Sequence, residues 1–202
     1  MPRFLSFLPL IALIALSAPV SAQDDAAAEE EPGASIEDQL AVGETPSGEP
    51  QLGETYIKEP VGDWELRCIR TETPEDDPCQ LYQLLKEPNG NALAEISLFR
   101  LPEGNKLPAG ATIIVPLETL LTGQLGIVVD DGQPKSYPFS FCNRQGCFAR
   151  IGLTAEDIAS YKRGVAAKVM IRPYAAPDQI VTSTMSLKGF TAGFDKAGVL
   201  EQ

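Results

Sequence analysis

The positions of the cysteines constrain the fold of this chain more than any other feature. They form two pairs that are close in the sequence, Cys68 with Cys79 and Cys142 with Cys147. An even number of cysteines is typical of disulfides in exported proteins. Three connectivities are possible, and the spacing favours the two local ones. On a loop-entropy estimate, the shorter ring would stabilise the fold by roughly 2 kcal/mol and the longer ring by roughly 3 kcal/mol.

The segment from Phe139 to Arg150 predicts a β-hairpin around the second pair. Aromatic residues flank Cys142 and Cys147, and residues 143–146 supply a tight polar loop. A redox-active pair normally has Cys-x-x-Cys spacing, which is absent here. Zinc is disfavoured as well, because neither pair has that spacing and the chain contains no histidine. The sequence therefore predicts structural disulfides and no metal site.

The first 22 residues have the pattern of a secretory signal peptide. Arg3 precedes an apolar run from Phe4 to Leu16, and the small residues Val20-Ser21-Ala22 predict cleavage after Ala22. The apolar run is shorter than the roughly 20 residues of a membrane span. We therefore expect an exported protein, periplasmic or secreted, with no transmembrane segment in the mature chain.

Residues 23–60 predict a disordered acidic tether. They contain eleven Asp and Glu residues against the single Lys58, and Tyr56 is their only aromatic residue. Such a segment buries too little apolar surface to offset the entropy of ordering it. The alternative is an acidic tail that folds on a basic partner. Residues 61–202 carry seventeen acidic and fourteen basic residues, so neither part has the basic surface that nucleic acid requires.

Residues 61–202 predict one mainly β domain. Period-two alternation, as in Trp64 to Cys68, and turn signals such as Pro88-Asn89-Gly90 divide the segment into eight or nine short strands. Because these strands do not alternate with long helices, we expect a two-sheet β-sandwich.

Two short helices are also expected in this domain. Thr154 is a suitable N-cap with Asp157 three residues later, and Gly164 suits the C-terminal end. Near the C-terminus, Phe190 and Phe194 have helical spacing, which indicates a short helix packed on the core.

The residue content disfavours catalysis. Without histidine there is no Ser-His or Cys-His dyad, and no glycine-rich phosphate loop is present. The acidic pairs Asp130-Asp131 and Glu156-Asp157 are more typical of turns and helix caps than of glycosidase pairs. We therefore expect no catalytic residue, no cofactor and no enzyme. An envelope hydrolase that uses carboxylates is the alternative.

Several motifs follow one another in a defined order across residues 61–202. They are Gly62-Asp63-Trp64 with Cys68, Cys79 at the start of the next strand, Pro138 to Cys142, Gly146 to Ala149, Gly164 before an apolar strand, and Ser186 to Phe190. In this order they resemble the invasion-associated locus B family, small exported proteins of alphaproteobacteria. The resemblance implies an immunoglobulin-like sandwich, a periplasmic or surface location and, for some members, a part in entering host cells. It brings no catalytic residues, and the acidic tether lies outside it.

These features together predict an exported, non-enzymatic binding protein of the bacterial cell envelope. Loops or a sheet edge would contact an envelope or host protein. A contribution to host-cell association or invasion is a further expectation from the resemblance.

Overall fold

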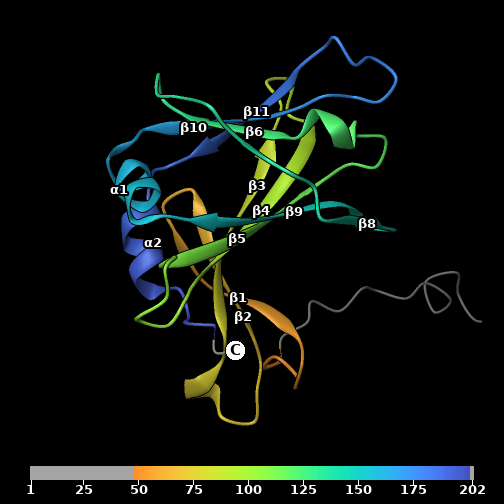
Figure 1. The fold of residues 1–202 in the computed structure, drawn as a ribbon. Helices are drawn as coiled ribbons and strands as arrows, with labels where there is room; N and C mark the ends of the chain where they lie inside the picture. Colours follow the sequence, from red (N-terminus) through yellow and green to blue (C-terminus); the bar gives the residue numbers. More distant parts are fainter. Residues whose placement is uncertain (1–47, 201–202) are drawn as a thin grey trace, which may run out of the picture. The chain divides into compact units, whose positions relative to one another are not determined.

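In residues 48–200, the part of the chain that this computed structural model describes, eleven strands pair into one continuous antiparallel sheet (Figure 1). The strands are β1 (Thr55–Val61), β2 (Trp64–Ile69), β3 (Cys79–Lys86), β4 (Ala92–Arg100), β5 (Ala109–Val115), β6 (Leu125–Val129), β7 (Lys135–Tyr137), β8 (Phe141–Asn143), β9 (Gly146–Leu153), β10 (Ala166–Ile171) and β11 (Val181–Ser186). Their order in the sheet is β7-β6-β10-β11-β3-β4-β5-β9-β8, with β2 also paired to β3 and β1 paired to β2. The expected mainly β class is confirmed.

Most of the expectations for the N-terminal part concern residues that the structure does not describe. The signal peptide at 1–22 and positions 23–47 of the tether lie outside the described residues, so both stay predictions. Within residues 48–200, no helix has the length and apolarity that crossing a membrane would require.

The sheet branches at β3, and this branching corrects the expected immunoglobulin-like sandwich. Residues 79–82 of β3 pair with β2, whereas Lys86 pairs with Thr184 of β11 on the same edge of β3. The two branches belong to one curled sheet and not to two separate sheets (Figure 1). Each strand has one buried and one exposed face in either architecture. The local pattern therefore predicts the strands but not the long-range pairing that distinguishes the two folds.

Strand β1 corrects the expected boundary of the tether at residue 60. Thr55 to Val61 pairs antiparallel with β2, and Tyr56 packs against a small cluster of Val61, Leu66, Cys68 and Cys79. Backbone pairing with β2 and the packing of Tyr56 thus dock the end of this acidic segment on the domain. The described domain begins at least six residues earlier than Val61.

Both expected helices are present. Helix α1 (Ala155–Arg163) begins with a capping box, in which the Thr154 side chain and Asp157 each bond the other's backbone N–H. Helix α2 (Phe190–Lys196) buries Phe190 and Phe194. The two helices lie together on one side of the sheet (Figure 1). Two 3-10 turns, η2 (Pro74–Asp76) and η3 (Leu121–Gly123), lie in loops.

The main core is organised around Trp64 and Phe190. Their rings meet edge to face with centroids 5.7 Å apart, and Tyr161 of α1 contacts Phe190 in the same way at 5.4 Å. The Trp64 indole N–H donates a 2.8 Å hydrogen bond to the carbonyl of Ser186 in β11. These contacts join the start of the domain to its C-terminal segment. They place both helices over the buried face of the sheet.

Candidate functional site

The four predicted cysteines form the two local disulfides. Cys68 lies directly opposite Cys79 across β2 and β3, and Cys142 lies opposite Cys147 across β8 and β9. The hairpin loop is shorter than expected, because Asn143 pairs with Gly146 and only two residues form the turn. The first disulfide is buried, whereas Cys142 is exposed. The two disulfides therefore occupy different environments.

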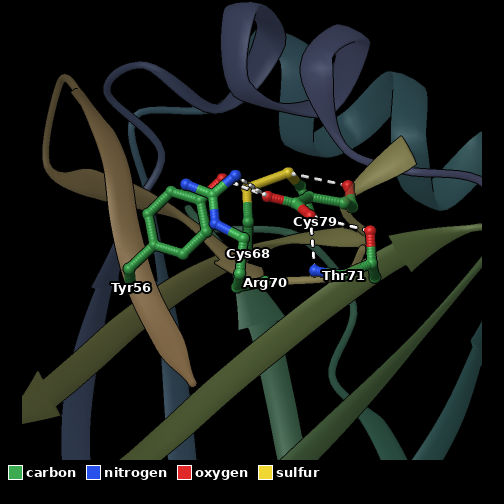
Figure 2. Close-up of a disulfide and its surroundings, with 6 residues drawn as sticks. Tyr56, Cys68, Arg70, Thr71 and Cys79 are labelled. Carbon is green, nitrogen blue, oxygen red and sulfur yellow. Dashed lines mark hydrogen bonds and ion pairs between the residues drawn. A yellow bond between two sulfur atoms is a disulfide. The ribbon is translucent and has the colours of Figure 1, made fainter. Parts of the chain in front are cut away.

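The first disulfide closes a loop beside Tyr56, Arg70 and Thr71 (Figure 2), and Asp77 also holds this loop. The Tyr56 hydroxyl donates to Asp77 Oδ2 at 2.6 Å, the Thr71 backbone N–H donates to Oδ1 at 2.7 Å, and the Arg70 guanidinium lies 3.0 Å from Oδ2. The hydrogen bond from Tyr56 is the largest cause that holds the pKa of Asp77 below its ordinary value. This carboxylate has protein partners at both oxygens, so we assign it a structural role.

The acidic pairs of the hydrolase alternative also have structural contacts. Asp130 accepts hydrogen bonds from the backbone N–H groups of Val165 and Ala166. Burial acts to raise the pKa of Asp157, but the hydrogen bonds from Lys135 and Thr154 outweigh burial and hold that pKa below its ordinary value. A general acid needs the opposite shift. Asp157 therefore does not support the hydrolase alternative.

A polar cavity lies beside Asp157. It has a volume of about 220 Å³ and lies between the β6–β7 pair and helix α1. Lys135 and Tyr137 of β7 line one side, and Asp157 and Tyr161 of α1 line the other. Sequence reasoning placed Asp157 on the helix but did not connect it with β7. Lys135 and Tyr137 are two positions apart in a strand, so strand periodicity predicts that their side chains lie on the same face.

An apolar groove lies against the second disulfide. Its lining combines residues 117–122, Tyr174 and the Cys142–Cys147 disulfide around a space of about 430 Å³. We call this surface the disulfide groove. Leu117, Leu121 and Tyr174 are 50%, 45% and 72% exposed, which is a high exposure for apolar and aromatic side chains in one place.

The loop of the disulfide groove has a defined conformation. The Leu120 N–H donates to the Arg172 carbonyl at 2.7 Å, and the Tyr174 N–H donates to the Glu118 carbonyl at 2.6 Å. Glu118 and Gln124 have positive φ angles of 68° and 56°, a conformation that non-glycine residues adopt only where their surroundings enforce it. The groove is therefore preformed.

Sequence reasoning only partly located this surface. The sequence predicted contacts through loops or a sheet edge only in general terms, whereas the groove uses the disulfide and residues 117–122. The latter follow Pro116 and contain three leucines without the periodicity of a strand or helix. Exposed apolar residues in a non-periodic loop are the available signal for this surface.

Comparison with known proteins assigns the family. The sequence model of the invasion associated locus B protein family matches residues 64–198. Two curated relatives, the invasion protein B homologs of Brucella abortus strain 2308 and of Brucella abortus biovar 1 strain 9-941, are each 26% identical over 155 residues, which is 77% of this chain and 84% of theirs.

A solved structure shares the fold. The crystal structure of invasion associated protein b from Bartonella henselae aligns with a TM-score of 0.57 at 18% identity, covering 71% of this chain and 94% of that chain. The family match extends from Trp64 in β2 to Gly198 just beyond α2, so it includes both disulfides, the cavity and the disulfide groove. This chain belongs to the invasion associated locus B protein family.

Proposed function

We propose that this protein is an exported, non-enzymatic binding protein of the bacterial cell envelope, and that the disulfide groove is its contact surface. The observation that carries the proposal is the exposed apolar lining of a groove whose loop backbone is held by hydrogen bonds. Preformed apolar surfaces of this kind favour protein partners, because little conformational entropy is lost when they bind.

The free edge of β8 indicates which kind of partner fits. β8 is the terminal strand of the sheet, and the Cα atoms of Cys142 and Cys147 are 4.0 Å apart. So short a distance identifies a non-hydrogen-bonded pair, in which the backbone N–H and C=O of Cys142 point away from β9. An extended segment of a partner protein could pair with these groups while its apolar side chains enter the groove.

The expected place of action follows from the signal peptide and the family. The signal pattern at residues 1–22 supports export, and two disulfides suit an oxidising compartment. The Brucella abortus relatives are named as invasion protein B homologs, which supports a contribution to host-cell association. Fractionation of the producing cells tests the compartment separately, since a protein found only in the cytoplasm would contradict export.

Photo-crosslinking in intact cells tests the contact surface. A photoreactive residue at position 121 is expected to give a specific adduct, whereas one at Val165, which is 78% exposed and does not line the groove, is expected to give none. The captured protein is then purified and its Kd measured. Leu121→Asp should weaken that Kd by more than about tenfold, since it places a charge in an apolar contact. Equal adducts at both positions, or an unchanged Kd, would rule out this surface.

A further inference from the structure

The polar cavity beside α1 has the features of a separate ligand site. Its lining shares no residue with the disulfide groove. Ile127 and Val129 of β6 supply an apolar wall, while the remaining lining comes from the turn after β6, from β7 and from α1. Apolar walls with a few convergent polar groups are typical of small-molecule sites.

Tyr161 lines this cavity with a hydroxyl that has no hydrogen-bond partner among residues 48–200. The residue is 3% exposed and lines the cavity. Its hydroxyl makes no side-chain hydrogen bond with any other residue between 48 and 200, whereas Tyr56 and Tyr82 each donate to a carboxylate. The hydroxyl is accessible from the cavity, where a water or a ligand can accept its hydrogen bond. Burial raises the pKa of Tyr161 well above its ordinary value, so the hydroxyl stays protonated and can donate.

The charges around the cavity limit the ligand. Lys135 is ion-paired with Asp157, and Glu156 also lines the cavity. One cation and two carboxylates give a formal charge of −1, which disfavours phosphates and other anions. Gln133 and Ser160 add neutral groups that can both donate and accept hydrogen bonds. The lining thus suits a ligand that has several hydroxyl groups and no negative charge.

Size and shape narrow the ligand further. The cavity of about 220 Å³ corresponds to the volume of about seven water molecules, which matches a single pyranose ring. The side chains of Tyr137 and Tyr161 provide aromatic surface for the C–H groups of such a ring, and the polar groups around them can bind its hydroxyls. Two tyrosines beside a mixed set of donors and acceptors are therefore a consistent arrangement for one sugar residue.

We propose that the cavity between β7 and α1 binds one neutral or cationic sugar ring, and that the Tyr161 hydroxyl donates a hydrogen bond to it. The same ring could be a free monosaccharide or the end of a glycan. For a ligand of about twelve non-hydrogen atoms, a Kd on the order of 1 mM is expected. The Lys135–Asp157 ion pair joins β7 to α1, the two elements that line opposite sides of the cavity.

Ligand-observed NMR with purified, oxidised protein tests the proposal. The probes are D-glucosamine, D-glucose and D-glucose 6-phosphate, titrated to about 20 mM, and saturation transfer is expected for the first two and not for the phosphate. D-cellobiose distinguishes the two sources of the ring: binding of cellobiose indicates the end of a glycan, and its absence indicates a free monosaccharide. Amide shifts of residues 133, 157 and 160 should accompany binding.

Two variants test whether sugar binding depends on the Tyr161 hydroxyl. Tyr161→Phe keeps the ring and is expected to weaken the Kd about tenfold. Tyr56→Phe removes the same hydroxyl from a tyrosine that lines neither the cavity nor the disulfide groove, and it should leave the Kd of the folded protein unchanged. Three results would each overturn the proposal: no saturation transfer to either sugar, tighter binding of the phosphate, or equal Kd values for folded wild-type protein and Tyr161→Phe.

Discussion

Gly62 and Gly189 lie back to back, although 126 positions separate them in the chain. A Cβ atom on Gly62 would lie 2.8 Å from the Cα of Gly189, and a Cβ on Gly189 would lie 2.9 Å from the Cα of Gly62. The next residue, Asp63, donates its backbone N–H to the carbonyl of Lys188 at 3.1 Å. Two of the motifs that carried the family resemblance, residues 62–64 and 186–190, therefore form one contact in the structure.

Gly189→Ala is expected to destabilise the domain by more than about 2 kcal/mol. The substitution adds a Cβ where backbone atoms already lie, and it also forces alanine to a φ of 89°. Gly90→Ala is the matched control, because Gly90 has a φ of 90° but no atom within 4 Å of the added Cβ. Urea unfolding of both variants separates the clash from the φ strain. Equal losses of stability in the two variants would contradict the close contact.

Gln83 substitutes for the missing backbone pairing between the two branches of the sheet. Its side-chain amide donates to the carbonyls of Asp63 and Ser186 at 3.0 and 3.2 Å, and its Oε1 accepts from the Ser186 N–H at 2.8 Å. The side chain is 7% exposed. It connects the start of β2, the middle of β3 and the end of β11 at the branch point.

Gln83→Leu should therefore cost about 3 kcal/mol of unfolding free energy. Leucine fills a similar volume but removes the hydrogen-bond partner of the Asp63 carbonyl and of the Ser186 N–H, at about 1 to 3 kcal/mol for each group. Gln179→Leu, at an exposed loop position, serves as the control and should change stability by less than about 0.5 kcal/mol. If both variants unfold at the same urea concentration, the branch point does not depend on Gln83.

The sequence predicted the elements of this fold better than their arrangement. Local patterns were sufficient for the central strands, for the capping box of α1 and for both disulfide pairings, because each depends on residues that are close in the chain. The pairing of Lys86 with Thr184 depends on residues almost a hundred positions apart, so the sandwich was predicted in place of one curled sheet. The groove and the cavity likewise combine separate segments.

Acid should weaken the loop that Asp77 holds. The folded pKa of Asp77 is lower than the unfolded value of about 3.8, so folding favours the ionised form. Its contribution is fully present above that unfolded value and is lost as the pH falls from about 3.8 through the folded pKa. We expect the Tm of wild-type protein to fall in this window, and Asp77→Asn to show a smaller fall. Asp76→Asn, at an exposed neighbouring position, should follow the wild-type curve; identical curves for all three proteins would contradict the role of Asp77.

Removal of the first disulfide should lower global stability, whereas removal of the second should also affect β8 and the disulfide groove. Replacing Cys68 and Cys79 by alanine should cost about 3 kcal/mol of global stability, since it opens a ring of about twelve residues in a buried cluster. Replacing Cys142 and Cys147 should cost about 2 kcal/mol on the same estimate.

The second disulfide should also have a local effect, because it staples a three-residue terminal strand and forms one wall of the disulfide groove. Without it, β8 is held on β9 by a three-residue pairing and the stacked rings of Phe141 and Phe148, and hydrogen exchange of residues 141–143 should accelerate while β3 and β4 stay protected. Partner binding at the groove should weaken even under conditions in which the domain remains folded. If instead the exchange of β8 is unchanged and the partner Kd is preserved, the disulfide contributes only to global stability, and the groove does not require it.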